Sequence, residues 1–312
     1  MKGKDFVTGL EADALDLDEL LALSLQLKEE QKKGVETQPL KNMSIAVIFE
    51  KPSTRTRVSF EVGLAQMGAH PVVLSGRDMQ LGRGETIEDT GRVLARYCDA
   101  IVIRTFAQDK LEALAQAAAV PVVNALSDLY HPCQALADML TIRERRGGLA
   151  GLKLAYFGDG NNVCHSLLIA AATAGMNMTV ACPDGYQPDP KVIAIANRLA
   201  EESGAEIAVT EDASAAADKA DALYTDVWVS MGQEAEKDAR LTALSPYRID
   251  EAILATAKAD ALVMHCLPAH RGEEITGAVL DGPNSVIFDQ AENRLHAQKA
   301  LMVTLMEQRG GR

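Results

Sequence analysis

A five-residue run at positions 53–57 combines three hydroxyl side chains with two arginines. It lies between an apolar run, 45–49, and a helix-like run, 58–67. The start of a helix has unpaired N–H groups and a partial positive charge, and arginine binds planar oxyanions through two hydrogen bonds. One hydroxyl would suffice for an ordinary helix cap, but two arginines in a first turn favour a bound phosphate-like anion. The predicted site residues are Ser53, Thr54, Arg55, Thr56 and Arg57.

Two further groups follow expected strands in the same half of the chain. Arg104 lies at the end of the apolar run 100–105, where a charged residue often only reaches solvent. His131 and Gln134 open an expected helix, 131–146, one turn apart, and both can donate to a carbonyl or amide. Together with the run 53–57, they predict a phosphate site beside a small polar group.

A glycine turn at 158–163 half-matches the G-x-G-x-x-G pattern of dinucleotide-binding proteins, with Asp184 some twenty residues further on. The match is weak, because many tight strand-to-helix turns contain glycines. Asn161 and Asn162 in this turn offer amide donors and acceptors. The turn therefore keeps a nicotinamide-dependent dehydrogenase open as an alternative.

Asp226 and Cys266 each stand at the end of an expected strand in the second half of the chain. Most free cysteines are small buried hydrophobes, but a thiol beside His265 at a strand end is better placed for chemistry. Ser230 and Met231 lie in the polar segment 228–240, which is long enough for a mobile lid.

Strand-like and helix-like segments alternate along the whole chain, which predicts an α/β protein of two doubly wound parallel-sheet domains flanked by helices. Gly147 and Gly148 suggest a boundary, giving domains 1–146 and 147–290, and we expect the last helix, within 291–312, to pack on the first domain. Ligands of such sheets bind at the carboxyl ends of strands. The expected strands are 44–49, 71–75, 100–105, 121–125, 152–158, 178–182, 206–210, 221–226, 261–265 and 285–289. The expected helices are 17–31, 54–68, 86–97, 108–119, 131–146, 162–174, 190–203, 212–219, 248–258 and 291–308.

The composition limits the class of protein. The 312 residues carry a formal net charge of −13, which argues against a nucleic-acid partner. No apolar run approaches the roughly 18 residues of a membrane helix. The five cysteines show no CxxC spacing, so we expect neither a disulfide framework nor a metal-ligand cluster, and a cytoplasmic location.

The motifs in order resemble those of the ornithine branch of the carbamoyltransferase family, from the strand at 44–49 to Arg294. They are the run 53–57, His131-Pro132-Cys133-Gln134, Asp226 with Ser230-Met231-Gly232, and His265-Cys266-Leu267-Pro268. The resemblance implies transfer of a carbamoyl group from carbamoyl phosphate to the side-chain amine of L-ornithine, without a metal or other cofactor. It also implies a homotrimer with shared active sites.

The resemblance also implies roles for individual residues. Arg104, His131, Asp226 and Cys266 would be catalytic. The carbamoyl phosphate site would comprise Ser53, Thr54, Arg55, Thr56, Arg57, Gln80 from a neighbouring subunit, Arg104, His131, Gln134, Cys266, Leu267 and Arg294. The ornithine site would comprise Asn162, Asp226, Ser230 and Met231. Other acceptors of the carbamoyl group (aspartate, putrescine or an acylated ornithine), or a non-catalytic binding subunit, are the nearest alternatives.

Overall fold

The computed structural model describes residues 5–14, 16–76, 79, 84–230, 232 and 234–310. The chain divides into two compact units. The first comprises Met1–Leu140 with Glu292–Arg312, and the second comprises Thr141–Ala291. The division falls within helix α6 (Pro132–Arg146).

The first unit is built on a four-stranded parallel sheet with the order β2-β1-β3-β4. The central strands β1 and β3 are apolar on both faces, as expected of a parallel sheet covered by helices. Their register pairs Phe49 with Arg104, so both strands end at the same edge. All four strands predicted for this half are present. They are β1 (Ser44–Phe49), β2 (His70–Ser75), β3 (Ala100–Arg104) and β4 (Val122–Leu126).

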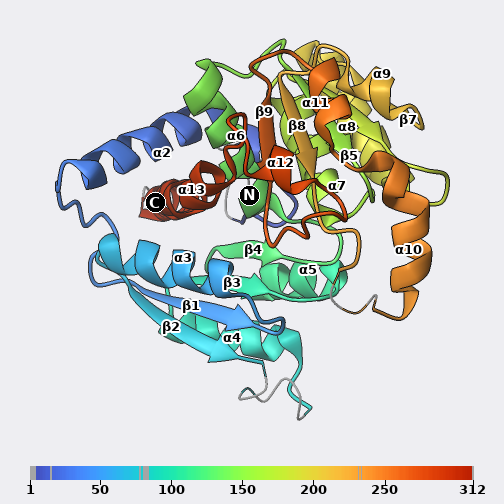
Figure 1. The fold of residues 1–312 in the computed structure, drawn as a ribbon. Helices are drawn as coiled ribbons and strands as arrows, with labels where there is room; N and C mark the ends of the chain where they lie inside the picture. Colours follow the sequence, from blue (N-terminus) through green and yellow to red (C-terminus); the bar gives the residue numbers. More distant parts are fainter. Residues whose placement is uncertain are drawn as a thin grey trace. The chain divides into compact units, whose positions relative to one another are not determined.

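Helices cover both faces of this sheet, and Figure 1 shows α3 on one face and α4 on the other. Leu111 and Leu114 of α5 and Leu94 of α4 pack with Ile101 and Ile103 of β3 in one apolar cluster. Helices α3, α4 and α5 thus each connect two parallel strands of this sheet, as predicted from the alternating pattern. The helices are α1 (Glu11–Ala14), α2 (Leu17–Lys32), α3 (Thr54–Gln66), α4 (Ile87–Tyr97), α5 (Gln108–Ala117) and α6.

The C-terminal helix α13 (Ile287–Gly310) joins the first unit from Glu292 onward, as the sequence predicted. Two buried lysines connect it to neighbouring helices. Lys28 Nζ donates to Asn293 Oδ1 at 2.8 Å, and Lys299 Nζ donates to Gln31 at 2.9 Å and Gln66 at 3.0 Å. Despite the 24-residue length of α13, no helix in the described part of the chain is long and apolar enough to cross a membrane.

The second unit contains a five-stranded parallel sheet with the order β7-β6-β5-β8-β9. Strands β5, β8 and β9 lie side by side, so the residues that follow them gather at one edge of the sheet. The strands are β5 (Lys153–Phe157), β6 (Asn177–Ala181), β7 (Ile207–Thr210), β8 (Ala222–Thr225) and β9 (Leu262–His265). The helices are α7 (Asn162–Thr173), α8 (Pro190–Ser203), α9 (Ala213–Ala217), α10 (Lys237–Leu244), α11 (Glu251–Thr256) and α12 (Gly277–Leu280), with short 3₁₀ turns at Glu234–Glu236 and Ser245–Tyr247.

Two predictions of local structure were wrong. The predicted strand 285–289 is absent, because Ser285 makes one isolated bridge to Val263 and α13 begins at Ile287. A short apolar run such as 286–288 does not distinguish a strand from a helix by periodicity. The segment 228–240 is not one continuous loop either, since α10 begins at Lys237.

Acid is predicted to destabilise the packing of α13 through His296. Burial, together with the positive charges of Lys299 and Lys28, lowers the pKa of His296 to about 4. An unfolded histidine has a pKa of about 6.5, so this stabilisation is complete above pH 6.5 and is lost as the pH falls towards 4. The loss amounts to at most about 3 kcal/mol.

We expect the midpoint of urea unfolding of the native protein to fall more steeply between pH 7 and pH 4.5 than that of His296→Gln. His70→Gln, at an exposed position of β2, is the control and should behave like the native protein. Equal pH dependence of the native protein and His296→Gln would contradict the assignment.

Candidate active site

The run 53–57 starts helix α3 shortly after β1 ends. Ser53 is the N-cap residue, and its Oγ accepts a hydrogen bond from the N–H of Thr56 at 3.3 Å. The same Oγ donates to Thr56 Oγ1 at 3.1 Å. Because β1 and β3 end in register at Phe49 and Arg104, the helix start that follows β1 begins at the edge of the sheet where β3 ends. The first N–H groups of a helix have no partner within the helix.

Arg294 of α13 connects this helix start to the start of α6. Its guanidinium donates to Thr56 Oγ1 and to Gln134 Oε1, each at 2.9 Å. Gln134 Nε2 in turn donates to Asp138 Oδ1 at 2.8 Å. Thr56, Gln134 and Arg294 are all almost fully buried. The structure thus brings together three segments that lie far apart in the sequence.

His131 lies in the positive field of this cluster. Burial, followed by the charges of Arg294, Arg104 and Arg55, holds the pKa of His131 well below its ordinary value. The imidazole is therefore neutral near pH 7 and can donate one hydrogen bond without carrying a charge. Three arginines and a neutral imidazole together form a site suited to an anion with an adjacent carbonyl group.

One predicted residue of the run 53–57 is not brought to this cluster. Arg57 lies on the exposed face of α3, where its Nε pairs with Glu61 Oε1 at 3.1 Å. Gln80 lies outside the described residues. The sequence could not distinguish the two arginines of the run, because both occupy the first turn of the helix.

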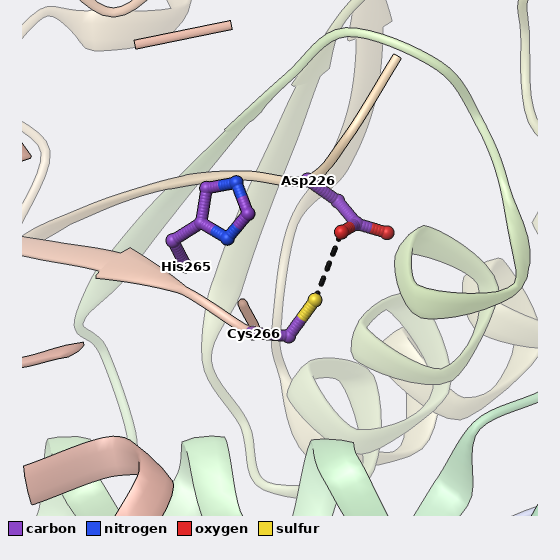
Figure 2. Close-up of side chains that lie close together, drawn as sticks. All are labelled: Asp226, His265 and Cys266. Atoms are coloured by element: carbon purple, nitrogen blue, oxygen red, sulfur yellow. Dashed lines mark hydrogen bonds between the residues drawn. The ribbon is translucent and has the colours of Figure 1, made fainter. Parts of the chain in front are cut away.

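A second polar cluster occupies the strand ends of the second unit, and Figure 2 shows its central pair. Cys266 Sγ donates to Asp226 Oδ1 at 2.9 Å. The side-chain amide of Asn161 donates to the other oxygen, Oδ2, at 2.8 Å. The carboxylate of Asp226 is thereby oriented from two sides and keeps further lone pairs for another donor.

His265 and Glu274 position the backbone that carries Cys266. His265 Nδ1 accepts the N–H of Leu267 at 2.9 Å, so the ring proton sits on Nε2, which faces Glu274 Oε1 at 3.1 Å. The side chains of His265 and Glu274 are both fully buried. They hold Leu267 in a left-handed conformation, with φ of 59°, which is unusual for a residue with a branched side chain.

The remaining predicted residues of the second unit have different positions. Asn162 opens α7, while its neighbour Asn161 both caps that helix and contacts Asp226. Ser230 is half-buried in the segment after β8, and Met231 lies outside the described residues. Asn161 was singled out in the sequence for its side-chain amide but was not included in the predicted ornithine site. The capping preference of asparagine at a helix start was a further signal for Asn161, whereas Glu274 had no signal and was not predicted.

The glycine turn after β5 is explained by packing. A Cβ at Gly160 would lie 2.3 Å from the backbone nitrogen of Pro188, and one at Gly158, with φ of +115°, would lie 2.8 Å from Trp228 Nε1. In dinucleotide-binding turns, such glycines allow the pyrophosphate to approach the backbone. Here another part of the chain occupies the space next to Gly160, which disfavours the nicotinamide alternative.

Two groups of side chains in the described part of the chain have the composition and spacing of metal ligands, whereas the sequence suggested none. One is Asp226, His265 and Cys266 (Figure 2), and the other is His270, Glu273 and Glu274. Both ring nitrogens of His265 already make hydrogen bonds within the protein. The first group is therefore better described as an internally hydrogen-bonded cluster.

The structure is that of a two-unit parallel α/β protein, with an arginine-rich cluster in one unit and a carboxylate–thiol pair in the other. The family model described as the carbamoyl-P binding domain of aspartate/ornithine carbamoyltransferase matches residues 4–144. The model of the Asp/Orn binding domain matches residues 150–305. The chain belongs to the aspartate/ornithine carbamoyltransferase family.

Similar proteins narrow the branch of the family. The ornithine carbamoyltransferase of Anoxybacillus flavithermus is 56% identical over 306 residues, covering 98% of each chain. That of Parafrankia sp. is 57% identical over 309 residues, covering 99% of this chain and 98% of the relative. The solved structure of the Pyrococcus furiosus ornithine carbamoyltransferase has a TM-score of 0.94 at 50% identity, covering 98% and 97% of the two chains. The resemblance proposed from the motifs is confirmed.

Replacing Gly160 by alanine should destabilise the second unit, because the new methyl group would collide with the backbone of Pro188. Overpacking of this kind costs about 1–3 kcal/mol. Gly148→Ala is the matched control, since a Cβ there meets nothing within 4 Å. Urea unfolding followed by circular dichroism should show a lower midpoint for Gly160→Ala alone, and equal midpoints for both variants would refute this explanation.

Proposed function

We propose that the protein transfers the carbamoyl group of carbamoyl phosphate to the side-chain amine of L-ornithine, giving L-citrulline and phosphate. The observation that carries this proposal is the buried Arg294, which connects the hydroxyl-rich start of α3 to Gln134 beside His131. The similarity to proteins named ornithine carbamoyltransferase over nearly the whole chain supports the choice of acceptor.

The first unit is proposed to bind carbamoyl phosphate. The first turn of α3, with Ser53, Thr54, Arg55 and Thr56, supplies N–H groups, hydroxyls and a guanidinium for the phosphate. Arg104 and Arg294 add positive charge near His131. We leave Arg57 out of the site, because it pairs with Glu61 on the exposed face of the helix.

The same unit is proposed to stabilise the transition state. Attack on the carbamoyl carbon places negative charge on the carbonyl oxygen, which needs preorganised donors. Neutral His131, the hydroxyl of Thr56 and the guanidinium of Arg104 have the chemistry for that role. Gln134 has an amide that matches the carbamoyl amide, and the phosphate leaves from a site already lined with arginine.

The second unit is proposed to bind and orient ornithine. An alkylammonium has a pKa of about 10 and must lose a proton before it can attack. Asp226 can accept a hydrogen bond from that amine, because Cys266 and Asn161 orient its two oxygens and leave lone pairs for a further donor. Asn162, Ser230 and Met231 are proposed to bind the α-amino and α-carboxylate groups, and Cys266 and Leu267 to contact the carbamoyl group.

The charge of the second cluster distinguishes between acceptors. Aspartate would need cationic side chains facing its second carboxylate, whereas this cluster presents the carboxylate of Asp226. Putrescine lacks the α-carboxylate that Asn162, Ser230 and Met231 are proposed to bind. These differences favour ornithine over both compounds.

We also propose that residues 1–146 with the last helix form the carbamoyl phosphate domain, and residues 147–290 the ornithine domain. The protein is proposed to act as a cytoplasmic homotrimer in which Gln80 of a neighbouring subunit reaches the phosphate. Two exposed valines one turn apart on α3, Val58 and Val62, are consistent with a subunit contact in the first unit. The five cysteines are free, which is consistent with a reducing compartment.

The two arginines of the run 53–57 provide a matched test of the donor site. Arg55→Ala should lower the kcat for citrulline formation by about 10²–10³-fold, because a donor to the developing negative charge is lost. Arg57→Ala should stay within about twofold of the native protein, since it removes an exposed ion pair. A colorimetric citrulline assay, with circular dichroism to confirm folding, makes the comparison. Equal losses in both variants would invalidate the assignment.

The thiol of Cys266 provides a test of the acceptor site. Cys266→Ala should raise the KM for ornithine about tenfold, as expected when one hydrogen bond to a charged group is lost. The KM for carbamoyl phosphate should change less. Cys98→Ala, at a buried thiol of the first unit, is the control and should leave both constants near those of the native protein. An unchanged KM for ornithine in Cys266→Ala would rule out the proposed acceptor site. Higher turnover of putrescine or aspartate than of ornithine by the native protein would also rule it out.

A further inference from the structure

The loop that follows β9 contains a carboxylate oxygen whose burial the proposed reaction does not explain. The side chain of Glu274 is fully buried, and its Oε1 accepts hydrogen bonds from His265 Nε2 and from the backbone N–H of His270. Its second oxygen, Oε2, is also buried and has no hydrogen-bond donor among the described residues. An anionic oxygen buried without a donor is costly and normally has a cation or a donor beside it.

We propose that Glu274, Glu273 and His270 form a binding site for a divalent first-row transition-metal ion such as zinc. One ligand atom from each side chain lies within 4.8 Å of the other two. Glu274 also contacts His265 beside Cys266, but the proposal of an ion site does not depend on the proposed transfer reaction.

The distances between the ligand atoms are close to those that an ion would impose. His270 Nδ1 lies 3.7 Å from Glu274 Oε2 and 3.9 Å from Glu273 Oε2. Ligand atoms at about 2.1 Å from one tetrahedral zinc ion lie about 3.4 Å apart. The two distances from His270 therefore exceed that value by only a few tenths of an ångström, and the ligand oxygens of the two glutamates lie within 4.8 Å of each other. The exposed edge at His270 leaves room for water as a further ligand.

The loop already holds these side chains in place. The N–H of Glu273 donates to the carbonyl of His270 at 2.9 Å, and the N–H of Gly272 donates to the carbonyl of buried Ile275 at 2.8 Å. The hydrogen bonds to Oε1 of Glu274 fix the direction of Oε2, much as outer hydrogen bonds orient the carboxylate ligands of metals.

A lysine competes with the proposed ion but does not exclude it. Lys237 Nζ lies 3.6 Å from Glu273 Oε1, and both side chains are partly exposed. Ion pairs of this kind contribute about 0–1 kcal/mol, so a divalent ion could displace the ammonium group. One imidazole and two carboxylates form a mixed nitrogen–oxygen set, which suits zinc and cobalt better than calcium or magnesium.

Cobalt(II) is the probe that separates this site from Asp226, His265 and Cys266, because a thiolate ligand gives an intense charge-transfer band and a nitrogen–oxygen set does not. The full-length protein would be titrated with Co²⁺ and followed by absorption spectroscopy and calorimetry. The variants are His270→Ala, Glu273→Gln and Cys266→Ser. Glu202→Gln, at an exposed carboxylate of α8, is the matched control.

We expect one Co²⁺ per chain without a thiolate band, displaced by Zn²⁺ and retained in Cys266→Ser and Glu202→Gln. His270→Ala and Glu273→Gln should each weaken binding by at least about tenfold, because loss of even an outer hydrogen-bond partner of a metal ligand costs that much. The proposal would be overturned if the protein bound no Co²⁺, or if His270→Ala and Glu273→Gln bound it as well as Glu202→Gln does. A thiolate band that disappears in Cys266→Ser would also overturn it.

Discussion

The first unit depends on how it buries the guanidinium of Arg294. A buried cation requires partners, and Thr56 Oγ1 and Gln134 Oε1 both accept hydrogen bonds from it. The arginine ties three segments of the chain together, and its charge, with those of Arg104 and Arg55, acts on His131. Burial and these positive charges together lower the pKa of His131 well below its ordinary value. The neutral imidazole can then donate a hydrogen bond to a carbonyl oxygen.

In the second unit, the side chain that is positioned by hydrogen bonds is the acidic Asp226. Under the proposed function, Asp226 accepts a hydrogen bond from the amine of ornithine. Its side chain is oriented by two donors that carry no charge, the amide of Asn161 and the thiol of Cys266. The backbone after Cys266 is fixed in turn by His265 and Glu274. In both units, hydrogen bonds with uncharged groups help to position a charged side chain. Under the proposed function, the first cluster binds the anionic donor and the second binds the amine.

Much of this arrangement could be predicted from the sequence, because parallel strands bring their carboxyl ends to one edge. Arg104, His131, Asp226 and Cys266 were predicted by their places at strand or helix ends, and the resemblance to a family added Arg294. Periodicity could not separate a strand from a helix start at 286–288, nor could it show which arginine of the run 53–57 faces the cluster. The buried partner of His265, Glu274, lies nine residues along the chain in an irregular loop, and such loops have no periodic signal.

Calorimetric titration of carbamoyl phosphate into the native protein and Arg294→Gln tests the central claim most directly. Arg294 supplies both charge and the connection between Thr56 and Gln134, so the variant should bind carbamoyl phosphate about tenfold to a hundredfold more weakly, as expected for about 1.5–3 kcal/mol from a charged hydrogen-bonding group. Glu307→Gln, at an exposed position of the same helix, is the control. Native-like affinity in a folded Arg294→Gln protein would contradict the account.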